Sequence, residues 1–103
     1  MSEEVWIGAV EISPGEGNSV LGGATGAYTN VLVRASTLAD YERQVIGALD
    51  EENFLVIGIE DAEPLRERMS RVIVSDEIVR LGEQAAETGL AWTSFYAYPT
   101  DDT

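Results

Sequence analysis

The sequence predicts an α/β (α+β) fold, a two-layer sandwich in which a four-stranded mixed sheet packs against two long helices on one face. Two observations carry this prediction. Segments rich in β-branched and aromatic residues are typical of strands, and two further segments repeat apolar residues at helical spacing. The expected order is strand, strand, helix, strand, short helix, helix, strand. At 103 residues the chain fits a single domain, residues 1–103.

The first two strands are expected over residues 5–12 and 27–35. Residues 13–26 between them are predicted to form a flexible glycine-rich connection. A phosphate-binding loop would need a lysine and a helix directly after its glycines, but this segment has no lysine and leads into a strand. The connection is therefore a lid, a contact loop or a linker, and the sequence leaves these three roles open.

The first long helix lies within "STLADYERQVIGALDEEN", where Thr37 can cap the helix and Asp40 follows three residues later, which resembles a capping box. Its apolar stripe consists of Leu38, Tyr41, Val45 and Leu49. The next segment, "FLVIGIE", is almost entirely apolar. Such a run predicts a central strand that is buried on both faces.

Pro64 suits the first position of a short helix within residues 61–71. Residues 72–74 could extend this helix or form a short strand. Ser75 is the expected cap of the second long helix over 76–88, and Gly89 suits a left-handed exit from it. The last strand is "LAWTSFYAYP", and residues 99–103 are expected to fray. This order of elements resembles the broad ferredoxin-like class, and the resemblance concerns the fold alone.

Nineteen acidic residues and six basic ones, all arginine, give a formal net charge of −13. Such a chain repels nucleic-acid backbones and anionic membranes, whereas it attracts a basic protein partner. No cysteine and no histidine is present, which excludes thiolate chemistry and removes the usual general base near neutral pH. We therefore predict no catalytic residue, no cofactor and no metal. The acidic N-terminus and the absence of a long apolar run favour a cytoplasmic protein.

An aromatic sheet face is the first candidate binding surface. Side chains alternate across a strand, and one of the two alternating sets collects both tryptophans and three of the four tyrosines. A shift of one residue in any strand would move its whole set to the other face. The predicted partner-binding residues on this face are Trp6, Tyr28, Arg34, Trp92, Tyr96 and Tyr98.

An acidic contact surface is the second candidate, and it consists of Asp50, Glu51, Glu52, Glu60, Asp61 and Glu63. The two groups of acids flank one strand and so lie about 20 Å apart, at ~3.3 Å per residue. The second group could hold Mg²⁺ or Ca²⁺, but acids are abundant throughout the chain, which favours a solvated surface. Arg66, Arg68 and Arg71 follow, and a pair between Glu67 and Arg71 predicts an exposed helix with ion pairs. An anion contact is the alternative reading of these arginines.

The first functional hypothesis is a non-enzymatic module that binds a basic protein through the acidic surface and the aromatic face. In composition the chain resembles small acidic inhibitors such as immunity proteins that neutralise toxins. The alternative is a homodimer, either a small-molecule-binding protein or an enzyme, with an apolar pocket enclosed between two open sheet faces. A structural subunit without a site of its own is the third hypothesis.

Overall fold

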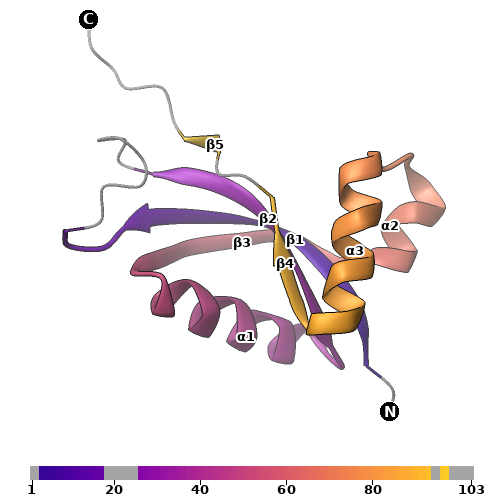
Figure 1. Ribbon diagram of the computed structural model, residues 1–103, viewed down its shortest axis with the longest axis horizontal. Coiled ribbons are helices and arrows are strands. Elements are labelled where there is room, and N and C mark those ends of the chain that lie inside the picture. The colour runs from indigo at the N-terminus through magenta and orange to yellow at the C-terminus, as the bar shows by residue number, and fades with distance from the viewer. Residues whose placement is uncertain (1–2, 18–25, 94–95, 98–103) are drawn as a thin grey trace, which may run out of the picture.

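A computed structural model describes residues 3–17 and 26–93 and the backbone of residues 96–97. The chain forms an antiparallel sheet in the order β3-β1-β2-β4, together with three helices (Figure 1). The strands are β1 (Glu4–Pro14), β2 (Ala27–Ala35), β3 (Phe54–Pro64), β4 (Leu90–Trp92) and β5 (Tyr96–Ala97). The helices are α1 (Leu38–Glu51), α2 (Leu65–Arg71) and α3 (Asp76–Thr88). The predicted α+β class is confirmed.

The sheet differs from the prediction in one respect, because every described strand pair is antiparallel and the sheet is therefore not mixed. β1 and β2 pair without interruption from Glu4 opposite Ala35 to Ile12 opposite Ala27. β5 pairs with the start of β2, so the predicted last strand is divided into β4 and β5. Two antiparallel neighbours flank β1, which makes it a central strand.

α1 packs along one face of the sheet, and this helix and the sheet form the two layers of the predicted sandwich (Figure 1). The expected cap is present, since the Thr37 hydroxyl accepts a hydrogen bond from the Asp40 amide at 3.1 Å. Tyr41, Val45 and Leu49 are fully buried, as their spacing predicted, whereas Leu38 is 45% exposed. The core beneath them consists of Val10, Ile12, Ala27, Val31, Val33, Ala35 and Phe54.

α2 and α3 pack against the opposite face, at the end of the sheet where β1 begins (Figure 1). Their cluster joins Leu65 and Ala85 of these helices to Ile7, Leu32 and Ala91 of the sheet. The prediction that both long helices share one face is therefore wrong. Adjacent residues in β2 explain why: Leu32 contacts α3, while Val31 and Val33 face α1.

Two of the local predictions are confirmed and two are not. The Ser75 hydroxyl accepts from the Ile78 amide at 3.2 Å, and Gly89 ends α3 with φ 95°. Pro64 is the N-cap of α2, one residue before the position expected for it. Residues 72–74 form neither helix nor strand.

The boundaries of the glycine-rich connection and the tail are only partly described. Ser13 and Pro14 belong to β1, so the connection between the strands begins later than predicted. Residues 18–25 and the predicted tail, 99–103, lie outside the described residues. No helix in the part of the chain that is described has the length and apolar character needed to cross a membrane.

Candidate functional site

The predicted aromatic residues do not share one face. In the observed register Trp6 lies opposite Val33 and Trp92 opposite Val31, which places both tryptophans on the side of α1. Tyr28 and Arg34 lie on the other side, opposite Glu11 and Val5 of β1. The backbone of Tyr96 pairs with that of Tyr28, but its side chain and all of Tyr98 lie outside the described residues. The predicted grouping is wrong because it placed Trp6 on the same face as Tyr28 and Arg34. The observed pairing of β1 with β2 is shifted by one residue from the pairing that this grouping requires.

Trp6 is partly buried and packs against the core. Its ring stacks on that of Tyr41 with centroids 6.4 Å apart, and its indole N–H is buried without a hydrogen-bond partner among the described residues. The Tyr41 hydroxyl donates to the Val31 carbonyl at 2.7 Å, and burial raises the pKa of Tyr41 far above its ordinary value. This phenol is therefore a structural donor and supplies no acid or base near neutral pH.

Arg34 and Tyr28 each have a partner within the protein. Arg34 Nη1 donates to the carbonyl of Ala86 at 2.6 Å, and its Nε lies 3.4 Å from a Glu3 carboxylate oxygen. Arg34 thus connects β2 to α3. Tyr28 is 37% exposed, and its hydroxyl donates to Glu11 Oε1 at 3.4 Å.

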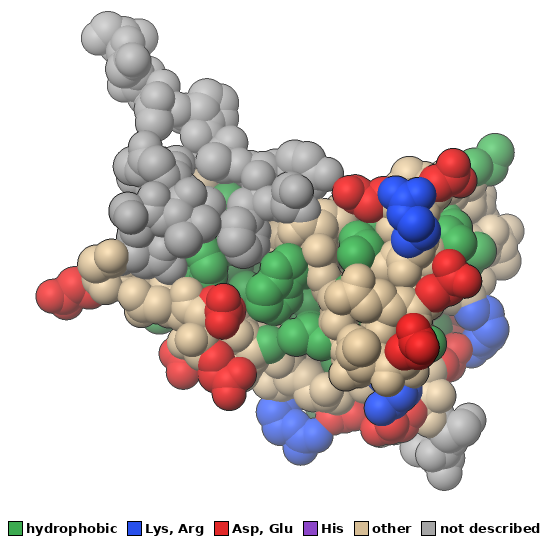
Figure 2. All heavy atoms as spheres, in the orientation of Figure 1, with side chains coloured by type: hydrophobic (Ala, Val, Ile, Leu, Met, Phe, Trp, Pro, Cys, Tyr) green, Lys and Arg blue, Asp and Glu red, His purple; other side chains and the backbone are tan. Residues whose placement is uncertain are grey.

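The predicted acidic surface is mostly exposed. Asp50, Glu51 and Glu52 lie at the end of α1, and Glu60 and Asp61 lie in the second half of β3. The two groups flank the exposed part of β3, as expected from their separation in sequence. Figure 2 shows further acidic side chains spread over the visible face, with arginines beside several of them.

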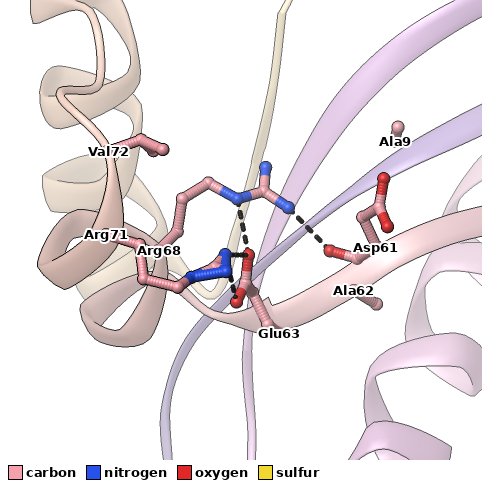
Figure 3. Close-up of a pocket in the computed structure, with 7 residues that line it drawn as sticks. All are labelled: Ala9, Asp61, Ala62, Glu63, Arg68, Arg71 and Val72. Carbon is pink, nitrogen blue, oxygen red and sulfur yellow. Dashed lines mark hydrogen bonds and ion pairs between the residues drawn. The ribbon is translucent and has the colours of Figure 1, made fainter.

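Glu63, the sixth predicted acid, is instead held by two arginines in a pocket between β3 and α2 (Figure 3). Its Oε2 accepts from Arg68 Nε at 2.8 Å and from Arg71 Nη2 at 2.6 Å. Arg68 also donates through Nη2 to the Asp61 carbonyl at 2.6 Å. The predicted partner of Arg71 was Glu67; the structure gives Glu63, because α2 packs back against the strand that precedes it.

The electrostatics of this pocket favour a structural role. The hydrogen bond from Arg68, followed by that from Arg71, holds the pKa of Glu63 below its ordinary value. The cavity has a volume of about 390 Å³ and is also lined by Ala9, Asp61, Ala62 and Val72. The lining contains two acids, Glu63 and Asp61, and two arginines, so its formal charge is zero and it gives an anion no net attraction. The hydrogen bonds from Arg68 and Arg71 to Glu63 therefore hold α2 against β3.

Asp61 owes its position to a β-bulge. Between the pairs Ile7–Glu63 and Ala9–Glu60, β3 has two residues where β1 has only Gly8. Asp61 occupies the left-handed region with φ 55°, a conformation that aspartate tolerates better than most residues. The bulge therefore lies within the second acidic group, between Glu60 and Glu63. In the described residues no three carboxylates lie close enough together to hold a metal ion.

The surface that the sequence did not predict is the edge of the sheet at β3. "FLVIGIE" suggested a strand buried on both faces, but β3 pairs with β1 alone among the described strands. Leu55 and Ile57 are 58% and 57% exposed. Acids at both ends of the strand were the available signal, since charged residues commonly flank an exposed edge. We call Leu55 and Ile57, with the flanking acids Asp50, Glu51, Glu52, Glu60 and Asp61, the β3 surface.

Comparisons with known proteins give no relative from which a role could be transferred. No family model, no curated protein and no solved structure matches the chain.

Proposed function

We propose that this protein is a non-enzymatic binding module that holds a basic protein partner at the β3 surface. The observation that carries the proposal is the exposure of Leu55 and Ile57 on an edge strand between two groups of acids. An apolar centre with a charged rim is the usual anatomy of a protein–protein interface. The cytoplasmic location expected from the sequence stays a prediction.

Each part of this surface has a separate physical role. Burying Leu55 or Ile57 against a partner gains about 1.5–3 kcal/mol for a side chain that goes from fully exposed to buried, and less from their observed half-exposure. The acids contribute mainly to the rate of association, because they attract positive charge over a distance set by the salt concentration. A partner therefore needs apolar side chains at its centre and lysine or arginine around them.

A second copy of the chain fits this surface less well. If two β3 edges paired antiparallel, the acids at the end of α1 in one copy would lie near Glu60 and Asp61 of the other. Like charges that face each other across strands oppose pairing. The homodimer that encloses a ligand remains the alternative function, and the oligomeric state tests it.

The test compares three baits of the same net charge, the wild type and two double variants. Leu55→Thr/Ile57→Thr removes the apolar centre and keeps strand-forming side chains. Ile46→Gln/Ile73→Gln removes apolar side chains that are 50% and 102% exposed elsewhere. Proteins retained by the wild type at about 0.15 M salt are identified by mass spectrometry, and the affinity of each is measured by calorimetry with all three baits.

We expect a basic partner that binds the first variant at least about tenfold more weakly and binds the second as it binds the wild type. Equal binding to all three baits would show attraction by charge alone and would contradict the proposal. The homodimer would be favoured if light scattering showed that the wild type is a dimer and that the Leu55→Thr/Ile57→Thr variant is a monomer.

A further inference from the structure

We infer that the groove between α3 and the edge of β4 is a second binding site, which takes an extended peptide segment by addition of a strand to β4. The groove has a volume of about 310 Å³ and is lined by Leu81, Gln84, Leu90, Ala91 and Trp92. In Figure 2 hydrophobic side chains gather in the middle of the view, where Figure 1 places β4. β4 and β3 lie at opposite ends of the strand order, so this site is separate from the β3 surface and does not rest on it.

The backbone of β4 is oriented for strand addition. The Gly89 carbonyl accepts from the Arg34 amide at 3.1 Å, and the Thr93 amide donates to the Asn30 carbonyl at 3.0 Å. Alternate residues of an antiparallel strand direct their backbone groups to opposite sides. Leu90 and Trp92 therefore direct theirs away from β2, toward the groove. Of these groups, the Leu90 carbonyl already accepts from the Thr88 hydroxyl at 3.1 Å.

The side chains around this edge provide both apolar contact and polar groups. Leu81 and Gln84 are three residues apart on α3 and so lie on one side of the helix. Leu90 and Trp92 also line the groove, and their side chains lie on the α1 side of the sheet. A peptide strand beside β4 would place alternate side chains against these apolar groups, while the Gln84 amide can both donate to and accept from its backbone.

Charge indicates the kind of peptide. α3 contains four acids and one arginine. Glu77 lies four residues before Leu81 and Glu87 three residues after Gln84, on the side of α3 that borders the groove. Arg80 lies between them and offsets one of these charges. With a chain charge of −13, the occupant that fits is a segment of another protein with alternating apolar and basic residues.

The probe for this site is the labelled peptide acetyl-Arg-Val-Lys-Leu-Lys-Val-Arg-amide, with binding measured by fluorescence anisotropy at about 0.15 M salt. A matched peptide carries N-methyl groups on alternate residues, which removes the donors that a strand ladder needs. Gln84→Arg adds bulk and positive charge in the groove. Ile46→Arg makes the same change in charge on α1, where Ile46 is 50% exposed.

We expect Gln84→Arg and N-methylation each to weaken binding by at least about tenfold, and Ile46→Arg by no more than about twofold. Backbone amide resonances of Leu90 and Trp92 should shift on titration, and Leu55→Thr/Ile57→Thr should bind as the wild type does. The inference is overturned by equal losses in the two arginine variants, by unchanged binding of the N-methylated peptide, by shifts confined to β3, or by a wild type that does not bind.

Discussion

At the scale of single residues, Gly8 determines how α1 meets the sheet. A Cβ at this position would lie 2.6 Å from the Tyr41 hydroxyl oxygen and 3.2 Å from Tyr41 Cε2. Because Gly8 has no side chain, the Tyr41 hydroxyl has room to reach the Val31 carbonyl. Close packing of this kind does not tolerate added volume without displacement.

Gly8→Ala is therefore expected to destabilise the fold by about 1–3 kcal/mol, measured by urea unfolding. Gly58→Ala is the matched control, because nothing lies within 4 Å of its added Cβ. Adding Tyr41→Phe removes the nearest clashing atom, so the double variant should lose about 1 kcal/mol less than the sum of the single losses. Additive losses would show that the hydroxyl is not the source of the clash.

Glu63 is expected to control part of the response to acid. Because hydrogen bonds from Arg68 and Arg71 lower the pKa of Glu63 in the folded state below the ordinary value of 4.5, its ionised form stabilises the fold above that value. This contribution is lost as the pH falls through the lowered pKa. Glu63→Gln should flatten the decline in unfolding midpoint between about pH 5 and pH 3. Glu42→Gln, the same change on the exposed side of α1, should retain the decline; a decline retained by both would assign it to other acids.

At the scale of secondary-structure elements, the sequence was most informative where the determinants are local. The caps Thr37 and Ser75 and the exit at Gly89 depend on neighbours within four residues, and all three are confirmed. The assignment of faces failed because it depends on which residue of β2 lies opposite Ile7, a pairing between distant segments. The β-bulge at Asp61 interrupts the alternation of side chains along β3, and no pattern in the sequence predicts it. Both candidate binding surfaces lie at the edge strands β3 and β4, and the structure was needed to show which strands are at the edges.

Two glycines in different backbone conformations give opposite expectations for one substitution. Gly47 lies inside α1 with open space around its Cβ position, so Gly47→Ala should stabilise the protein by about 0.5–1 kcal/mol. Gly89 has φ 95°, so Gly89→Ala should destabilise it by about 1 kcal/mol or more. Thermal unfolding of both variants measures the difference, and a shift of the same sign in both would refute the assigned conformations.

At the scale of the whole molecule, five of the six arginines form ion pairs with acids among the described residues, and six cations can balance at most six of the nineteen acids. A net charge of −13 on a chain of this size repels itself in the folded state. Screening should relieve that repulsion, since the Debye length falls from about 10 Å at 0.1 M salt to about 3 Å at 1 M. Exposed ion pairs weaken over the same range, but their contribution is small.

We therefore expect the thermal unfolding midpoint to rise with sodium chloride between these two concentrations. Asp50→Asn/Glu51→Gln changes the net charge by two, from −13 to −11, at the end of α1, whose last turn contains no basic residue. This variant should be more stable than the wild type at low salt by roughly 0.3–1 kcal/mol for each removed charge, because acids oppose the negative end of the helix dipole. Glu42→Gln/Glu83→Gln makes the same change in mid-helix and should gain less. If the midpoint instead falls as salt is added, the ion pairs stabilise the fold by more than the repulsion among the acids destabilises it.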